Sequence, residues 1–253
     1  GQPDLNPEMY LTVGVRNTHS KYRNRYIPDN LDPGLLDWLD ESIGDMAVPE
    51  VGFIWRGPLT GGGDALRSIQ LYLHGVDGEL KFQPDWPALE QLDTRMTLDV
   101  SELDAEVLAA NMGNATVKQA DVLVRPNTRS DNQMLLITGN VQSDLGDAID
   151  ILAQSPLKSR VQGLDGWNLS GNSRVNLDLK IPLGGDEGEG NKGKGNTESG
   201  SYKVDTVIEQ GLMSLPGTKV AFQQLQGTIK YRDKKGLHAE KIKGHFWGEP
   251  VSA

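Results

Sequence analysis

Residues 174–183 read RVNLDLKIPL, and an apolar residue occupies every second position from Val175 to Leu183. Successive side chains of an extended strand point to opposite sides of the backbone, so this pattern predicts a strand with one apolar and one solvated face. A helix would distribute the same residues around its axis. Because similar alternation recurs along the chain, the function depends on what these apolar faces contact.

The composition argues against several classes of protein. The 253 residues include 25 basic and 35 acidic side chains, whereas nucleic-acid binders carry a concentrated basic surface, so we expect no nucleic-acid partner. The absence of cysteine excludes disulfides and thiolate chemistry. No apolar run reaches the roughly 18 residues that span a bilayer. Since the chain starts at Gly1 and strand-like sequence lies near both ends, we expect it to be a piece of a longer protein.

Two segments have the features of short amphipathic helices, near residues 32–43 and 144–154. In the first, Asp32 is suited to the N-cap and Pro33 to the first helical position. Both place apolar residues at spacings of three and four, which gives a helix one apolar stripe. We expect the first helix to pack over the end of a sheet, because its acidic side chains would be repelled by anionic lipid.

The sequence divides the chain into four parts. These are residues 1–30, a lead-in and first strand; 31–183, the main β segment with both helices; 184–201, a Gly-rich flexible loop; and 202–253, further strands. Within the main segment, Asp77 and Gly78 separate two alternating runs and predict the turn of a β-hairpin.

A weak internal repeat is present. The segment that begins at Leu92 aligns with the segment that begins at Leu225, and after one gap Leu103 falls on Leu237. The identity is thin, but the alignment predicts that the two segments form equivalent structural units.

No residue pattern in the sequence indicates catalysis. The four histidines are scattered, and no pair has the spacing of a zinc-binding helix. The Gly-rich segment lacks the Gly-Lys-Ser/Thr sequence of a phosphate-binding loop, and its acidic residues match no calcium-binding loop. We therefore expect no catalytic residues, metal site or cofactor, and a protein that is not an enzyme.

The strand pattern leaves two architectures open. In a closed β-sandwich, the apolar faces of two sheets pack against each other and fill the interior. Alternatively, a long, twisted antiparallel sheet curves into a groove whose apolar face stays open. The pattern of alternation is the same in both cases.

Several phrases of the sequence resemble the YhdP-type members of the AsmA-like superfamily. They occur in the order found in that family and cover the chain from about Arg25 to Val251. The phrases are RYIPDNLDPGLLDWLDESIG, VGFIWRGPL, YLHGVDGELKFQPDWPALEQLD, SPL, GWNLSGNSRVNLDLKIPLG and LQGTIKYRDKKGLHAEKIKGHFWGEPV. The charged Gly-rich insertion and the lack of the family's N-terminal membrane anchor are departures.

This resemblance implies a periplasmic segment of a large envelope protein of Gram-negative bacteria, anchored in the inner membrane by a part absent here. The body of such a protein is a long β-groove that is thought to carry phospholipids between the inner and outer membranes. The expected partners are phospholipid acyl chains and neighbouring segments of the same protein. The expected lipid-binding residues are Val51, Phe53, Trp55, Ile69, Leu71, Leu73, Leu80, Phe82, Met96, Leu98, Val175, Leu177, Leu179, Ile181, Ile229 and Tyr231.

A second interpretation is a β-sandwich that acts as a scaffold between envelope domains or binds protein or glycan. Four tryptophans near predicted turns could serve such binding: Trp38, Trp86, Trp167 and Trp247. A filled interior would favour this interpretation, and a long open apolar cleft would favour lipid transport.

Overall fold

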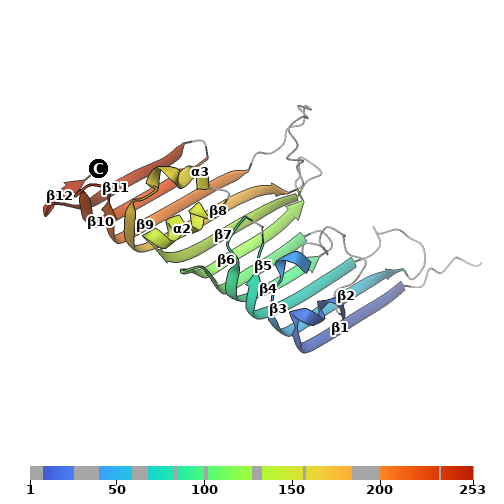
Figure 1. The fold of residues 1–253 in the computed structure, drawn as a ribbon. Coiled ribbons are helices and arrows are strands. Elements are labelled where there is room, and N and C mark those ends of the chain that lie inside the picture. The colour runs from blue at the N-terminus through green and yellow to red at the C-terminus, as the bar shows by residue number, and fades with distance from the viewer. Residues whose placement is uncertain are drawn as a thin grey trace, which may run out of the picture.

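The protein folds as one long antiparallel sheet. The computed structural model describes residues 8–25, 40–58, 68–82, 85–99, 102–126, 133–155, 158–183, 200–233 and 235–252. Twelve strands follow one another in the sheet in sequence order (Figure 1). They are β1 (Glu8–His19), β2 (Ala47–Pro58), β3 (Ser68–Leu80), β4 (Leu89–Asp99), β5 (Glu102–Met112), β6 (Ala115–Pro126), β7 (Gln133–Asp144), β8 (Asn168–Leu183), β9 (Ser201–Ser214), β10 (Ala221–Arg232), β11 (Gly236–Phe246) and β12 (Glu249–Ser252).

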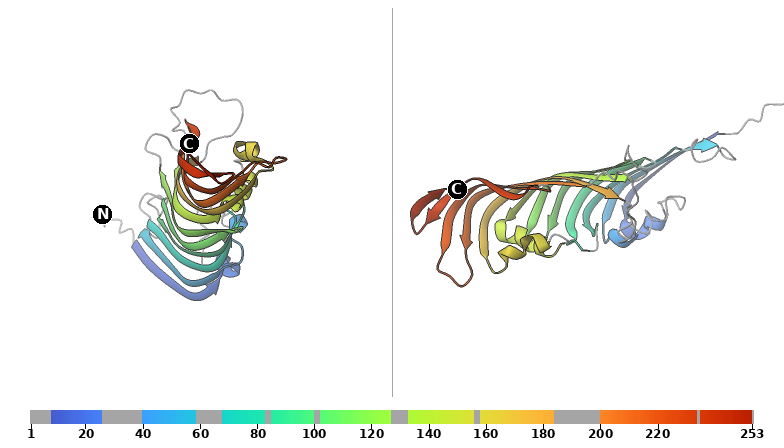
Figure 2. Two further views of the ribbon diagram at one scale, coloured as in Figure 1. Left: turned by 90° about the vertical axis from the view of Figure 1, so that its left-hand side faces the viewer. Right: turned by 90° about the horizontal axis from the view of Figure 1, so that it is seen from above.

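The sheet is open and curved. Seen along its long axis, the strands bend into a trough (Figure 2, left). All the described strands belong to this one sheet, with β1 and β12 as its outer strands. The closed β-sandwich is therefore wrong, and the open, curved antiparallel sheet is confirmed.

The register places the apolar residues of successive strands on one face. Residues that lie directly opposite each other in neighbouring strands share a face of the sheet. Leu71 pairs with Phe53 of β2 and with Leu98 of β4. In the second half of the sheet, Leu177 pairs with Gly139 of β7 and with Val204 of β9. The alternate residues that lie on the apolar face pair with one another in every strand pair from β1 to β11, so this face is continuous.

Most strands contain a β-bulge where the sheet bends. A bulge adds one residue to a strand and increases its local twist and bend. The register shifts once in the pairings of β2 with β3, β6 with β7 and β8 with β9. It shifts twice in the pairings of β3 with β4 and β4 with β5, and in both pairings of β10. Several bulge residues have a positive φ, namely Asp77, Gln91, Gln210, Gln224 and Lys241.

The bulges preserve the face on which side chains lie. Val48 and Val51 are three positions apart, yet both are at most 2% exposed, because the extra residue between them restores the parity. The prediction of a hairpin turn at Asp77 and Gly78 is wrong, because these residues belong to a bulge. β3 runs through both residues, and Asp77, at φ 51°, provides a bulge in place of a turn. Gly78 lies under Met46, whose Cε would be 2.4 Å from an added Cβ.

The predicted repeat corresponds to equivalent parts of the sheet. Its two copies form β4–β6 and β10–β12. Gln91 and Gln224 directly precede the first residues of the two copies, and both have φ 51°. The turns that follow also match, because Gly113 and Trp247, which lie equally far beyond Leu103 and Leu237, both have a positive φ.

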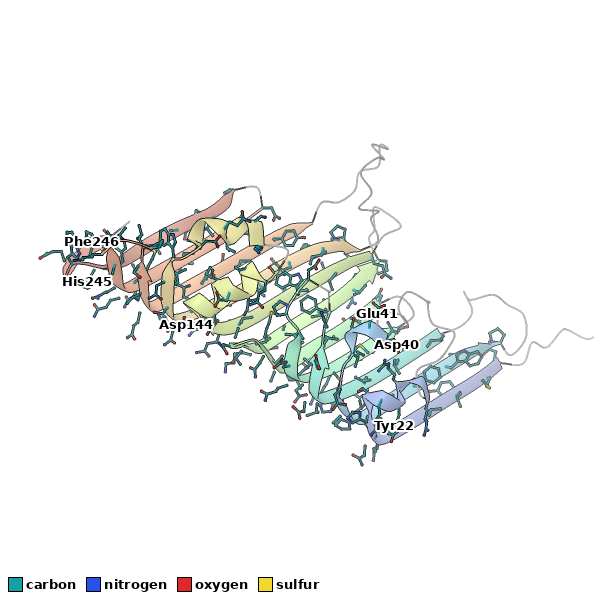
Figure 3. All side chains as sticks on the ribbon, in the orientation of Figure 1. Tyr22, Asp40, Glu41, Asp144, His245 and Phe246 are labelled. Atoms are coloured by element: carbon teal, nitrogen blue, oxygen red, sulfur yellow. The ribbon has the colours of Figure 1, made fainter. Side chains whose placement is uncertain are left out.

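Short helices lie along one long side of the sheet, which we call the helical rim (Figure 1). This side carries the connections from odd- to even-numbered strands. The helices are η1 (Ser20–Arg25), α2 (Leu145–Ala153), α3 (Lys158–Val161) and η3 (Gln162–Leu164). The helix predicted near residues 144–154 is confirmed as α2, and Asp144 at its start accepts a hydrogen bond from the Gly146 N–H at 2.9 Å (Figure 3).

Two predicted segments fall largely outside the described residues. Of the helix expected near residues 32–43, the described residues 40–42 are helical. Of the Gly-rich loop expected at 184–201, only Gly200 and Ser201 are described.

Two apolar clusters hold the trough together. The larger extends from β2 to β6 and contains Leu71 and Leu92, which are 2% and 1% exposed. In the smaller, Leu145 of α2 packs with Ile208 of β9 and Leu225 of β10, which attaches this helix to the sheet.

Replacing Leu92 with alanine should lower the free energy of unfolding by about 2–5 kcal/mol, because the truncation leaves a cavity in the larger cluster. Leu11→Ala removes the same atoms from the apolar face of β1, where the side chain is 41% exposed, and should cost less than about 1 kcal/mol. Urea unfolding followed by circular dichroism measures both losses, and equal losses would contradict this view of the core.

The bulge at Gln224 gives a second prediction. A left-handed conformation costs a residue with a Cβ roughly 1–2 kcal/mol, and glycine avoids this cost. Gln224→Gly should therefore be neutral or stabilising, whereas Gln224→Val should destabilise. The φ of the neighbouring residue Gln223 is not positive. At this position the order should reverse, so that Gln223→Gly is less stable than Gln223→Val. The same order at both positions would exclude a strained bulge.

Candidate functional site: the apolar lining of the trough

The continuous apolar face forms the inside of the trough, and we call it the apolar lining. Side chains converge on the concave face of a curved sheet and diverge on the convex face. Accordingly, Val51 and Leu71 are 2% exposed, whereas their neighbours Glu50 and Gln70, on the opposite face, are exposed.

The predicted lipid-binding residues lie on this lining, with one exception. Their register connects them across the strands through pairs such as Val51 with Leu73, Leu73 with Met96, and Val204 with Tyr231. The residues on the lining are Val51, Phe53, Trp55, Ile69, Leu71, Leu73, Leu80, Met96, Leu98, Val175, Leu177, Leu179, Ile181, Ile229 and Tyr231. Phe82 follows the end of β3, and its ring centroid is 5.9 Å from that of Trp86 on the helical rim. Their role in lipid binding remains a prediction.

Sequence reasoning did not assign the central part of the lining. The strands β5–β7 and β9 were expected, but their inward side chains were not named as binding residues. These side chains are Leu103, Ala105, Val107, Ala120, Val122, Val124, Leu135, Ile137, Val141, Tyr202 and Val204. These residues could have been found from the same alternation of apolar residues, because inward residues of a strand pair with inward residues of the neighbouring strand.

Much of the lining remains accessible. Phe53, Trp55, Leu177 and Leu179 are only half-buried. In the part of the chain that the structure describes, no second sheet faces the lining, and the helices follow one side of the trough. A contiguous accessible apolar surface of this kind marks an interaction site.

The tryptophans considered for the alternative binding role lie in different settings. Trp86 and Trp167 are half-buried, and Trp247 is 77% exposed at the turn between β11 and β12. The rings of Trp247 and Phe246 are stacked with centroids 4.7 Å apart. Trp38 lies outside the described residues.

The convex face is mainly polar, although Leu123 and Leu136 lie opposite each other on it, and it carries ion pairs between strands. The Lys203 ammonium lies 2.7 Å from Asp178 on β8, and the Arg232 guanidinium lies 2.6 Å from Asp205 on β9. The neighbouring Arg232 guanidinium holds the pKa of Asp205 below its usual range. Lys230 likewise lowers the pKa of Glu240, to which it donates a hydrogen bond. The two faces of the sheet therefore differ sharply in chemistry.

The ion pair between Arg232 and Asp205 predicts a pH dependence of stability. Because the pKa of Asp205 is lower in the folded than in the unfolded chain, its contribution is present above about pH 4 and is lost as the pH falls through the folded value. The variant Asp205→Asn should therefore lose less stability than the wild type between pH 5 and pH 2. Urea unfolding across this range measures the difference.

The main candidate for a functional site among the described residues is the apolar surface of the lining. Among them, no group of three or more His, Cys, Asp or Glu side chains is placed to hold a metal ion. His74 contacts Asp93 at 3.1 Å on the convex face, away from the lining. Within the same residues, no helix has the length and apolar character needed to cross a bilayer. The arrangement can bind apolar groups and keep them from water.

Comparisons with known proteins show the family to which this chain belongs. The whole chain, residues 1–253, matches the family described as YhdP protein. It is 21% identical over 262 residues to the intermembrane phospholipid transporter YhdP of Escherichia coli (strain K12). The match covers 97% of this chain and 18% of that relative, so the chain spans less than a fifth of its length. No solved structure matches the chain. With a fold of one open β-sheet and a family match over its full length, the chain belongs to the YhdP family.

Proposed function

We propose that this chain is a segment of a phospholipid transporter, and that its apolar lining shields acyl chains as lipids pass between two membranes. The observation that supports this proposal is the unbroken register of apolar residues from β1 to β11. The relative from Escherichia coli is named as an intermembrane phospholipid transporter. Lipid headgroups would remain in solvent at the open side of the trough.

The energetics favour such a lining. Burial of a methylene group is worth about 0.8 kcal/mol, so moving a chain of about 16 carbons through water costs on the order of 10 kcal/mol. An apolar surface along the route removes much of this barrier. The role of the lining residues is solvation, and no covalent step is required.

The length of the sheet suggests how the segment contributes. Strands lie about 4.8 Å apart, so twelve of them extend the lining by roughly 50 Å. This is part of the distance across an envelope, which suits a segment placed in the periplasm in series with neighbouring segments. An anchor in the inner membrane would be provided by another part of the full-length protein.

A charge on the lining should block lipid binding. The variant Leu177→Asp places a carboxylate on the half-buried apolar face, where contact with acyl chains would desolvate it. The 253-residue chain is incubated with vesicles of phosphatidylethanolamine and phosphatidylglycerol and re-isolated, and its lipid is measured by mass spectrometry. We expect bound lipid to fall about tenfold or more in this variant.

The neighbouring residue gives a matched control. Asn176→Asp adds the same charge one residue away, but on the convex face, where Asn176 accepts a hydrogen bond from Asn140. It should bind lipid like the wild type. Loss of binding in both variants would indicate a general effect of charge. A folded wild-type chain that takes up no lipid would favour the scaffold function instead.

A further inference from the structure

A cleft on the helical rim has the chemistry of a headgroup site. Its volume is about 490 Å³, and we call it the rim cleft. It lies between the connection from β3 to β4 and the junction of α2 with α3. Its lining residues are Asp85, Trp86, Pro87, Ala153, Gln154, Ser155 and Lys158.

The rim cleft borders the central part of the apolar lining. Leu89, two residues after Pro87, begins β4 and pairs with Leu80 on the lining. On the other side, α2 is held near the turn between β5 and β6 by a hydrogen bond of 2.9 Å from Asn114 to Asp147. The cleft is therefore flanked by segments that enter β4 and leave β7, at the edge of the lining of β5 and β6.

The adjoining lining carries small side chains. Ala120 pairs with Gly139 of β7, and Ala105 pairs with Met96 of β4; all three small residues are half-buried. Bulky residues occupy corresponding positions on both sides, such as Leu73 on β3 and Leu177 on β8. Acyl chains attached to a headgroup in the cleft would lie over this part of the lining.

The charges of the rim cleft are of both signs and are set apart. Lys158 is positioned by its backbone N–H, which donates to the carbonyl of the buried Ser155 at 3.0 Å. Asp85 lies on the opposite wall, beside Trp86. Among the described residues, neither Lys158 nor Asp85 forms an ion pair. Both residues are exposed, so their charged groups can contact a ligand.

The surroundings favour a cation near Asp85. The face of an indole ring attracts ammonium groups, and the Trp86 ring is oriented by its contact with Phe82. Lys158 supplies the complementary positive charge for a phosphate.

We infer that the rim cleft binds the zwitterionic headgroup of an ethanolamine phospholipid, with the phosphate at Lys158 and the ammonium at Asp85 and Trp86. This inference rests on the proposed function for the path of the acyl chains. It also goes beyond it, since it assigns a headgroup class and a place along the trough where lipids pause.

A headgroup without acyl chains tests the cleft separately from the lining. Glycerophosphoethanolamine is titrated into the ¹⁵N-labelled 253-residue chain, and the indole N–H resonance of Trp86, assigned with Trp86→Phe, is followed by NMR. We expect a saturable shift, and a smaller one with glycerophosphoglycerol, which lacks the ammonium. Asp85→Asn and Lys158→Gln should each weaken binding about tenfold, as expected for losing one charged contact.

Matched variants control for net charge. Asp165→Asn and Lys219→Gln change exposed residues elsewhere on the same side of the sheet and should leave the titration unchanged. If the resonance does not move while the chain still takes up phospholipid from vesicles, the headgroup site is overturned and the proposed function stands. If it moves but no phospholipid is taken up, the cleft is supported and the transport function fails.

Discussion

The structure depends on one constraint, which is the side-chain parity of an antiparallel sheet. A slip of one residue in any strand pair would move the apolar set of that strand to the convex face. The pairing of β7 with β8 avoids this over its full length, since residues from Gln133 to Asp144 lie opposite residues from Leu183 to Asn172 without a shift. In seven of the other ten strand pairs the register does shift, but the bulges come close to the same level in successive strands, so the parity recovers.

Curvature and continuity therefore have a common origin. Each bulge bends its strand, and a row of bulges across the sheet bends the whole sheet into a trough. Residues beside this row, such as Val48 and Leu92, are the most buried because the bend brings their neighbours closer. Lining residues farther from it stay partly accessible. The same backbone feature thus provides both the packed base of the trough and its open apolar walls.

The convex face contributes to the stability of the sheet, whereas the concave face carries the candidate functional surface. Ion pairs between strands on the convex face, among them Arg232 with Asp205, favour the native register while each adds only modestly to stability. The concave face keeps apolar side chains half-exposed in place of a second layer. That arrangement gives up hydrophobic burial that a sandwich would gain, which is understandable if a ligand completes the burial. The helical rim adds charged and aromatic groups at one side, where the proposed headgroup would contact the protein without entering the lining.

The sequence by itself determined the strands, because a period of two is a local property of the backbone. It also determined the helix at α2, whose N-cap Asp144 and apolar spacing are local signals. It did not reveal that Asp77 and Gly78 form a bulge, since a turn and a bulge use the same left-handed conformation and differ only in what the following strand pairs with. Nor could it choose between sandwich and open trough, or bring Trp86 near Lys158 across the intervening strands β4 to β7. Those outcomes were decided by the tertiary structure, because they depend on which strands lie side by side and on bends that add up across the sheet.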